Sequence, residues 1–333
     1  MDILVCGGAG FIGSAFIKHH IKLFPQSKII NLDALTIGSN LGNLYELEKN
    51  PNYQFIKNDI TNEIILDKFV KKVDVVINFA AESHVDRSIA NPRPFIQTNV
   101  FGTYNILESI RKFDKKFIHI STDEVYGDAD GKSSFNEDSL ISPSNPYAAT
   151  KAAADHLVAS YHKTYGINCI TTRCTNNFGT HQFPEKLIPK TIIRSLKNLK
   201  IPLYGDGKQI RSWIYVNDHV SAIESLISKG ASGQVYNITA YEEISNKTIV
   251  EKILDILEKP HDMIEYVDDR PGHDKRYSID CSKIENQIGW KPEFDFDNAL
   301  KQTVHWYTQN NSWWEPLIGE NTLHPQPWTI KWK

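Results

Sequence analysis

Two adjacent carboxylates, Asp123 and Glu124, follow an apolar run at residues 117–120. The run predicts a buried strand that leads through Ser121 and Thr122 into a loop. In open α/β sheets, ligands lie beyond the carboxyl ends of the strands. Two carboxyl groups held close together in a partly dry pocket can differ in protonation at neutral pH, so that one acts as acid and the other as base. The pair is therefore a candidate for acid/base chemistry, with an acidic turn or a helix cap as the alternative.

Tyr147 and Lys151 stand four residues apart at the start of a helical pattern over residues 146–165, so their side chains share a face. At about 5 Å, an ammonium stabilises a phenolate by about 3 kcal/mol at an effective dielectric of about 20. We therefore expect the pKa of Tyr147 to fall by roughly two units toward neutrality. Such a tyrosine can remove a hydroxyl proton as hydride leaves the same carbon. The same spacing of Tyr and Lys is common on exposed helices, so the pair alone is weak evidence for a catalytic role.

A glycine loop near the N-terminus supports a redox role for the Tyr-Lys pair, because it predicts a dinucleotide-binding site. The loop joins a short apolar strand pattern to a helical pattern through residue 24, with glycines at Gly7, Gly10 and Gly13. Glycines at this spacing let the backbone approach a pyrophosphate at a helix N-terminus. The next strand ends at Asp33, where a carboxylate can bind the ribose hydroxyls of NAD and repel the 2′-phosphate of NADP. The sequence therefore predicts NAD as the cofactor.

Further apolar strands at residues 53–57 and 73–79 continue the alternation of strands and helices. This pattern predicts an α/β fold of the Rossmann type, with a doubly wound parallel sheet. The small residues Ala80 and Ala81, and the hydroxyl of Ser83, follow one of these strands where a cofactor would lie against the backbone. Small residues also pack well in turns, so these three are weak signals by themselves.

The composition excludes several classes of protein. The 333 residues carry a net charge of -3, and the pI is near 6.5, which argues against a nucleic-acid or anionic-membrane surface. No targeting segment opens the sequence, and no apolar run approaches the ~20 residues that cross a bilayer, so we expect a soluble cytoplasmic protein. The four cysteines form no CxxC pair. We therefore expect reduced thiols and no metal site.

The chain resembles the extended short-chain dehydrogenase/reductases, and within them the dTDP-glucose 4,6-dehydratases. The motifs that carry the resemblance cover nearly the whole length: GGAGFIG, AAESHVDRSI, STDEVYG, PYAATK, TNNFGTHQFPEKLIP, YGDGKQIRSWIYVNDH and DRPGHDKRY. The glycine loop and the Tyr-Lys pair identify only the superfamily. The discriminating feature is Thr122-Asp123-Glu124, because related sugar-nucleotide epimerases lack the acid/base pair.

The resemblance implies a three-stage reaction on tightly held NAD. Tyr147, assisted by Thr122 and Lys151, would deprotonate the glucose C4 hydroxyl while hydride passes from C4 to NAD. Glu124 would then remove the C5 proton as Asp123 protonates the departing C6 hydroxyl, and water leaves. The hydride finally returns to C6 and a proton returns to C5, which gives dTDP-4-keto-6-deoxyglucose. The implied activity is that of a hydro-lyase.

The resemblance also implies two sets of binding residues. The expected cofactor-binding residues are Gly7, Gly10, Phe11, Ile12, Gly13, Asp33, Ala34, Leu35, Thr36, Asp59, Ile60, Ala80, Ala81, Ser83, Thr98, Tyr147, Lys151 and Asn177. The expected substrate-binding residues are Ser83, Thr122, Asn176, Lys186, Leu187, Ile188, Pro189, Pro202, Leu203, Tyr204, Arg211, Asn246, Arg270 and His273. Arg211 and Arg270 have the strongest physical support, because a guanidinium can contact phosphate in a bidentate manner.

The sequence also predicts how the chain is divided. We expect residues 1–177 to form the NAD-binding domain, with residues 212–238 returning to it. Residues 178–211 and 239–333 would form a smaller, interleaved C-terminal α/β domain that binds the sugar nucleotide, with helices near 245–257, 282–288 and 297–309. By analogy with the family, helices at about 94–113 and 146–165 would pair across a homodimer.

Two other interpretations remain open. The chain could be another NAD-dependent sugar-nucleotide enzyme, namely a UDP-glucose 4,6-dehydratase, an epimerase or a decarboxylase. Thymidine and uridine differ by one methyl group, worth only about 1 kcal/mol in an apolar pocket, so the sequence does not choose between them. A noncatalytic NAD-binding sensor would be expected to lack Tyr147 or Lys151, and both are present.

Overall fold

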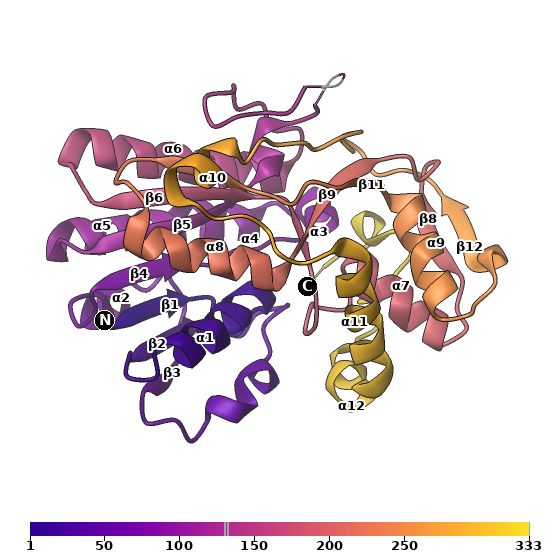
Figure 1. Cartoon of the computed structure of the whole chain (residues 1–333), viewed down its shortest axis with the longest axis horizontal. Helices are drawn as coiled ribbons and strands as arrows, with labels where there is room; N and C mark the ends of the chain where they lie inside the picture. The colour runs from indigo at the N-terminus through magenta and orange to yellow at the C-terminus, as the bar shows by residue number, and fades with distance from the viewer. Residues whose placement is uncertain (130, 132, 333) are drawn as a thin grey trace.

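The computed structural model describes residues 1–129, 131 and 133–332, and its largest element is a seven-stranded parallel sheet (Figure 1). The strand order is β10-β6-β5-β4-β1-β2-β3, which is the doubly wound arrangement that the sequence predicts. The strands are β1 (Ile3–Cys6), β2 (Ile29–Asp33), β3 (Tyr53–Lys57), β4 (Val75–Asn78), β5 (Lys116–Thr122), β6 (Cys169–Cys174) and β10 (Val235–Ile238).

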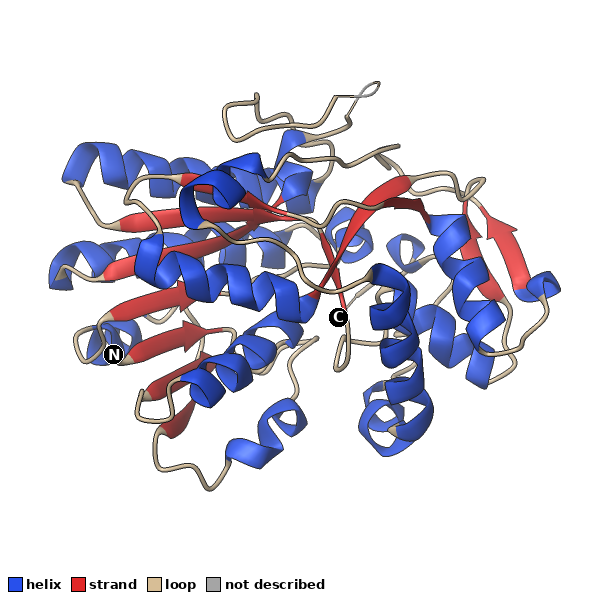
Figure 2. Ribbon diagram, viewed as in Figure 1, coloured by secondary structure: helices blue, strands red, loops and turns tan. Residues whose placement is uncertain are grey.

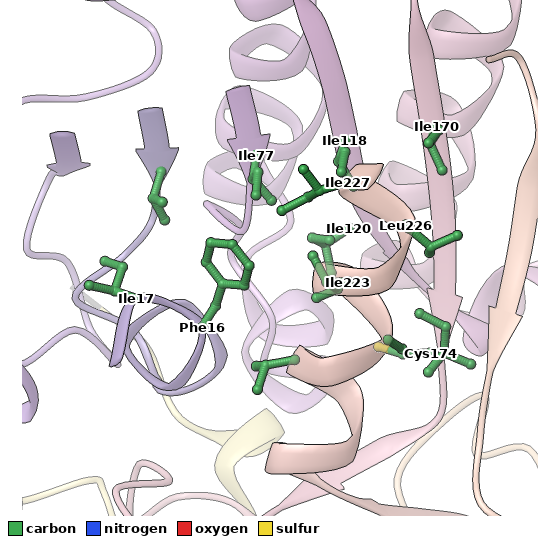
Figure 3. Close-up of a cluster of buried hydrophobic side chains, with 14 of the residues drawn as sticks. Phe16, Ile17, Ile77, Ile118, Ile120, Ile170, Cys174, Ile223, Leu226 and Ile227 are labelled. Carbon is green, nitrogen blue, oxygen red and sulfur yellow. The ribbon is translucent and has the colours of Figure 1, made fainter. Parts of the chain in front are cut away.

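Alternate side chains of each strand serve two separate cores, one on each face of the sheet. Ile3 and Val5 of β1 join the first core, and Leu4 and Cys6 join the second. Figure 3 shows the first core, where α1 and α8 cover the strands with isoleucine, leucine and phenylalanine side chains. The helices are α1 (Phe11–Leu23) and α8 (Val216–Lys229) on this face, and α2 (Glu63–Val70), α5 (Thr103–Phe113) and α6 (Pro146–Tyr165) on the other.

Two smaller sheets and their helices lie beside the carboxyl ends of the large sheet (Figure 2). Their strands are β7 (Asn176–Phe178), β9 (Ile210–Tyr215) and β11 (Glu243–Ser245) in one sheet, and β8 (Ile201–Tyr204) and β12 (Ile264–Val267) in the other. A core of aromatic and aliphatic side chains joins them to α7 (Leu187–Leu196), α9 (Asn246–Ile256), α11 (Phe296–Gln309) and α12 (Asn311–Trp314).

Two expected segments lie elsewhere than the sequence suggested. The strand β10 returns to the large sheet beside β6, but β9 pairs with β7 and β11. The reason is that Trp213 and Tyr215 of β9 pack with Phe178 in the smaller core. The expected helix at 282–288 forms as α10 (Ser282–Ile288), yet Ile284 and Ile288 pack into the core under α8 instead of the smaller core.

The remaining helical segments connect these parts. A continuous helical stretch of α4 (Arg93–Phe95), the π-helix η2 (Ile96–Gly102) and α5 agrees with the helix expected near residues 94–113. Shorter segments are α3 (Val85–Ala90), η1 (Leu41–Leu47), η3 (Asp123–Tyr126), η4 (His261–Met263), η5 (Glu315–Leu317) and η6 (Pro327–Thr329). In the part of the chain that the structure describes, no helix combines the length and the apolar character needed to cross a membrane.

Candidate active site

The Asp123-Glu124 pair lies directly after β5, at the carboxyl edge of the large sheet. Thr122 ends the strand, and its Oγ1 accepts a hydrogen bond of 3.3 Å from the Glu124 backbone N–H, which caps η3. The turn ends at Gly127, whose φ is +82° and where a Cβ atom would lie 2.2 Å from the Ser142 carbonyl oxygen. Only glycine fits there, so the turn that presents the two carboxylates is fixed at both ends.

Asp123 is almost fully buried, with 2% of its surface exposed. Its Oδ1 accepts a hydrogen bond from Thr122 Oγ1 at 3.1 Å, and its Oδ2 has no hydrogen-bond partner among the described residues. Burial, and then the neighbouring Glu124 carboxylate, raise the pKa of Asp123 to about 8. The side chain therefore carries a proton at neutral pH and can donate it.

Glu124 has a different environment from its neighbour. It is only partly buried, and its Oε2 lies 3.3 Å from Asn145 Nδ2 and 3.3 Å from the Tyr277 hydroxyl. Asn145 donates a hydrogen bond to the carboxylate, whereas the single Tyr277 hydroxyl proton is shared between Glu124 and Asp274 Oδ2, which lies 2.5 Å away. Asp123 is therefore the candidate acid of the pair, and the less buried Glu124 is the candidate base.

Tyr147 and Lys151 lie on the first turns of α6, beside the carboxylates. Burial raises the pKa of Tyr147 well above its ordinary value, the nearby Glu124 raises it further, and a hydrogen bond with Thr122 lowers it. The expected lowering by Lys151 is therefore wrong. Lys151 Nζ donates to the Ile120 carbonyl oxygen at 2.7 Å, and burial lowers the pKa of Lys151 to about 8. In this arrangement, desolvation of the phenol outweighs the attraction of the ammonium.

A cavity of about 280 Å³ runs along the carboxyl edge of the sheet from the glycine loop to these catalytic candidates. All five candidates, Thr122, Asp123, Glu124, Tyr147 and Lys151, line it. Of the expected cofactor-binding residues, those that line it are Gly7, Gly10, Phe11, Ile12, Gly13, Asp33, Ala34, Thr36, Asp59, Ile60, Ala80, Ala81, Ser83, Thr98, Tyr147, Lys151 and Asn177.

The glycine loop leaves room only for backbone. Gly7 has a φ of +79°, and a Cβ atom on it would lie 2.5 Å from the Ala80 backbone nitrogen. A Cβ atom on Gly13 would lie 2.4 Å from the Gly7 carbonyl oxygen. The loop leads into the N-terminus of α1, where the first N–H groups have no partner within the helix. Such a cradle suits a diphosphate that approaches the backbone closely.

The Asp33 carboxylate, at the end of β2, is held in place by two backbone N–H groups. Its Oδ2 accepts a hydrogen bond from the Ala9 N–H at 2.9 Å, and its Oδ1 accepts one from the Leu35 N–H at 2.8 Å. Each oxygen keeps a second lone pair for a ribose hydroxyl. Leu35 is the exception among the expected cofactor residues, because it does not line the cavity. Its backbone, in the left-handed region with a φ of +56°, instead orients the Asp33 carboxylate.

The expected substrate residues fall into two groups. Ser83, Thr122, Asn176 and Lys186 line the cavity, and Lys186 Nζ donates to the Ser83 carbonyl oxygen at 2.8 Å. The cavity does not include the ten others: Leu187, Ile188, Pro189, Pro202, Leu203, Tyr204, Arg211, Asn246, Arg270 and His273. Among them, Ile188 and Leu203 pack into the smaller cores, which leaves their backbone as the part that can face a ligand.

The charged members of the second group gather around α3 and the loop at residues 269–277. Arg270 donates to Asp86 Oδ1 at 2.8 Å, and Tyr204 donates to Asp86 Oδ2 at 2.8 Å. Burial alone would raise the pKa of Asp86, but the Arg270 guanidinium brings it well below its ordinary value. The Arg211 guanidinium lies 4.1 Å from the centre of the Tyr277 ring. The two guanidinium groups near this loop are candidate ligands for a diphosphate.

The chain is similar to known sugar-nucleotide dehydratases over nearly its whole length. The family model for GDP-mannose 4,6 dehydratase matches residues 4–303. A dTDP-glucose 4,6-dehydratase of Escherichia coli is 45% identical, over 96% of each chain. Solved structures of dTDP-glucose 4,6-dehydratases are equally similar. The Bacillus anthracis structure, in complex with NAD, is 44% identical with a TM-score of 0.90, and the Streptomyces venezuelae structure, with NAD bound, is 41% identical with a TM-score of 0.94. Each match covers 96% of this chain and 100% of the chain in the solved structure.

The chain belongs to the dTDP-glucose 4,6-dehydratase family. The resemblance predicted from the sequence is thereby confirmed, as is the doubly wound fold. The match to the family model, residues 4–303, includes the glycine loop, the other cavity residues, Arg211 and Arg270.

The structure adds residues to this dehydratase site that the sequence analysis did not single out. Tyr277 and Asn145 contact Glu124, and the Arg87 guanidinium donates to Glu185 at 3.0 Å. Glu185 also lines the cavity. The signal for most of them was present, since Arg87, Glu185 and Tyr277 lie inside three of the matching motifs. Only the fold reveals which neighbours each of them meets.

Proposed function

We propose that this chain catalyses the NAD-dependent dehydration of dTDP-glucose to dTDP-4-keto-6-deoxyglucose. The observation that carries the proposal is the buried Asp123 carboxyl beside Glu124, both within one cavity with Tyr147. An elimination needs a base for one proton and an acid for the leaving hydroxyl. The names of the curated relatives, 41–45% identical over nearly the full chain, support the same reaction.

The residues of the cavity fit NAD. The glycine loop, where a Cβ atom at Gly7 or Gly13 would meet backbone within 2.5 Å, would hold the diphosphate, and Asp33 would hold the adenosine ribose. Ala80, Ala81 and Thr98 would lie along the cofactor. When bound, NAD supplies a hydride acceptor for the C4 hydrogen and later returns the hydride to C6.

Oxidation at C4 is assigned to Tyr147. As a phenolate, its oxygen takes the C4 hydroxyl proton, and Thr122, which hydrogen-bonds to both Tyr147 and Asp123, can pass a proton to Asp123 once that residue has given up its own. Lys151 is anchored by its bond to the Ile120 carbonyl, so its ammonium is fixed close to α6 and the cofactor. Because burial raises the pKa of Tyr147, the phenol carries its proton at rest and must lose it before its oxygen can take the C4 proton.

Elimination is assigned to the two carboxyl groups. The 4-ketone acidifies the C5 hydrogen, and Glu124, held by Asn145 and Tyr277, removes it as a proton. Asp123 donates its proton to the C6 hydroxyl, the C6–O bond breaks, and water leaves. Asp123 ends as a carboxylate and Glu124 as an acid, and Glu124 returns its proton to C5 when the hydride reaches C6, which completes the 4-keto-6-deoxy sugar.

The substrate nucleotide is assigned to the second half of the chain. Arg211 and Arg270 would bind the diphosphate, because Arg211 is buried, Arg270 is partly buried, and Arg270 Nε has no hydrogen-bond partner among the described residues. The remaining substrate residues expected from the sequence, including Asn246 and His273, would complete the nucleotide site. In this proposal, residues 1–177 bind the cofactor and the second half of the chain binds the sugar nucleotide.

A homodimer and a cytoplasmic location are part of the same proposal. Ile96, Phe101 and Tyr104 on the helical stretch 93–113, and Tyr165 on α6, are each 40% or more exposed. Apolar side chains gathered on two neighbouring helices suit a contact with a second copy. The four cysteines are buried and unpaired, which suits a reducing compartment.

The deciding experiment is to incubate the purified protein with dTDP-glucose and, separately, with UDP-glucose, and to follow each product by mass. Loss of one water from dTDP-glucose without net NADH is the expected result. Loss of water from UDP-glucose alone would assign the uridine nucleotide instead. An unchanged mass from both substrates would contradict the proposal and favour an epimerase or a binding protein.

A further inference from the structure

The C-terminal segment from Leu323 to Trp332, here called the strap, ends near α3 at the centre of the molecule (Figure 1). It contains the 3-10 helix η6, which packs on α3. Two buried side chains of α7 hold its start: Lys190 Nζ donates to the His324 carbonyl at 2.9 Å, and Arg194 donates to the Leu323 carbonyl at 2.6 Å. The strap therefore joins α7, a helix of the smaller core, to α3.

Trp328, in the middle of the strap, meets the second group of substrate residues. Its ring contacts the Tyr204 ring edge-on, with centroids 4.7 Å apart and an interplanar angle of 82°. The Tyr204 hydroxyl donates to Asp86, which also accepts from Arg270. The indole thus limits where the tyrosine ring can lie, and through it where the Asp86-Arg270 pair lies.

Trp332, at the end of the strap, contacts Arg87 of α3. The Arg87 guanidinium lies 5.5 Å from the centre of the indole ring. The same guanidinium donates to Glu185 at 3.0 Å, and Glu185 lines the cavity. The Trp332 Nε1–H donates to the Pro327 carbonyl at 2.9 Å, so the strap folds back on itself and holds this ring in place.

We propose that the strap is a positioning element for the sugar nucleotide, with Trp328 and Trp332 fixing Tyr204 and Arg87 in the orientation that binds substrate. This proposal rests on the proposed function for the identity of the ligand. It assigns the strap no part in the chemistry, because Trp328 and Trp332 are absent from the lining of the cavity that holds Tyr147 and the carboxylates.

The test compares Trp328→Ala with Trp328→Phe, which keeps a ring edge against Tyr204, and with Lys331→Ala, an exposed residue of the same strap. We expect Trp328→Ala to raise KM for dTDP-glucose about tenfold, the scale of one aromatic pair contact. Its kcat and its bound NAD should stay unchanged. Calorimetric titration with dTDP should show the same loss of affinity, Trp328→Phe should restore most of it, and Lys331→Ala should match the wild type.

Equal KM and equal dTDP affinity in Trp328→Ala and the wild type would overturn the proposal, as would a fall in kcat alone. If the wild type itself released no water from dTDP-glucose, the proposed function would fail first. Hydrogen exchange then still tests the strap, since it needs no substrate. Faster exchange in Val85–Ala90 and Ile201–Tyr204 of Trp328→Ala than of Lys331→Ala supports positioning, and equal exchange contradicts it.

Discussion

The Tyr277 hydroxyl lies 3.3 Å from Glu124 Oε2, although the two residues are 153 positions apart in the chain. The same hydroxyl donates to Asp274 at 2.5 Å, and the ring lies under the Arg211 guanidinium. One side chain thus joins the proposed base to the proposed diphosphate site. The loop at residues 269–277 therefore has to be in place before Glu124 is oriented for C5.

Removal of this hydroxyl should impair elimination more than oxidation. Tyr277→Phe keeps the ring under Arg211 and loses only the hydroxyl contacts, so we expect dehydration to slow about tenfold, the cost of one hydrogen bond to a charged group. C4 oxidation should proceed at nearly the normal rate. Stopped-flow absorbance of NADH separates the two steps. Tyr241→Phe, which removes a surface hydroxyl bonded to Glu285, is the matched control. Equal rates for both variants would contradict a role for Tyr277 in orienting Glu124.

Tyr147→Phe should block the reaction at its first step. The variant keeps the buried ring and loses the group that takes the C4 hydroxyl proton, so NAD reduction should fall by about a hundredfold or more. Tyr161→Phe lies on the same helix and removes a hydroxyl bonded to Glu108, so it should reduce NAD normally. Normal NAD reduction by Tyr147→Phe would assign the base to another group.

The buried Asp123 should make the protein less stable as the pH rises. Its pKa is about 8 in the folded chain and 3.8 in the ordinary reference state, so between these pH values the folded state holds the extra proton. Stability from this group is complete below pH 3.8 and is lost as the pH rises toward 8. Asp123→Asn removes the effect, so it should be more stable than the wild type near pH 8 by a few kcal/mol, at about 1.4 kcal/mol per unit of pKa shift.

Urea unfolding of both proteins near pH 4 and near pH 8 measures this difference. The gain from Asp123→Asn should be close to zero at the lower pH and largest at the higher one. A constant difference across the range would mean that Asp123 ionises normally in the folded chain, and its proposed role as an acid would lose its physical basis.

Gly13→Ala should abolish cofactor binding with little effect elsewhere. The new Cβ atom would lie 2.4 Å from the Gly7 carbonyl oxygen and 2.9 Å from Gly8 Cα, and these backbone atoms cannot move without opening the loop. We expect the bound NAD to be lost and the free energy of unfolding to fall by about 1–3 kcal/mol. Gly319→Ala, where the nearest atom would lie at 3.6 Å, serves as control. Retention of NAD by Gly13→Ala would place the diphosphate elsewhere.

The large sheet could be predicted because strands buried on both faces are nearly continuous apolar runs. The same property explains the one misplaced strand. Trp213, Ile214 and Tyr215 in β9 are apolar on both faces, which is also the pattern of a strand in the large sheet. Local sequence does not specify which sheet such a strand joins. The packing of Trp213 and Tyr215 against Phe178 decides it, and that contact joins residues far apart in the chain.

The candidate site could be predicted as far as local motifs reach. Asp123, Glu124, Tyr147 and Lys151 each lie in a short motif, and the fold brings them to one cavity. The pKa of Tyr147 was mispredicted because it depends on desolvation by surrounding residues, which spacing along a helix does not reveal. Contacts such as Arg87 with Glu185, 98 positions apart, depend on the tertiary fold in the same way.

The most direct test of the account is a single turnover of dTDP-glucose by Asp123→Asn. The variant keeps Tyr147 and Glu124 but has no proton to give to the C6 hydroxyl. We expect NADH to form at nearly the normal rate and to persist, with water loss slowed by about a hundredfold or more in rapid-quench mass measurements. Dehydration at the normal rate by this variant would contradict the assignment of Asp123 as the acid, and with it the central claim that the buried, protonated carboxyl drives elimination.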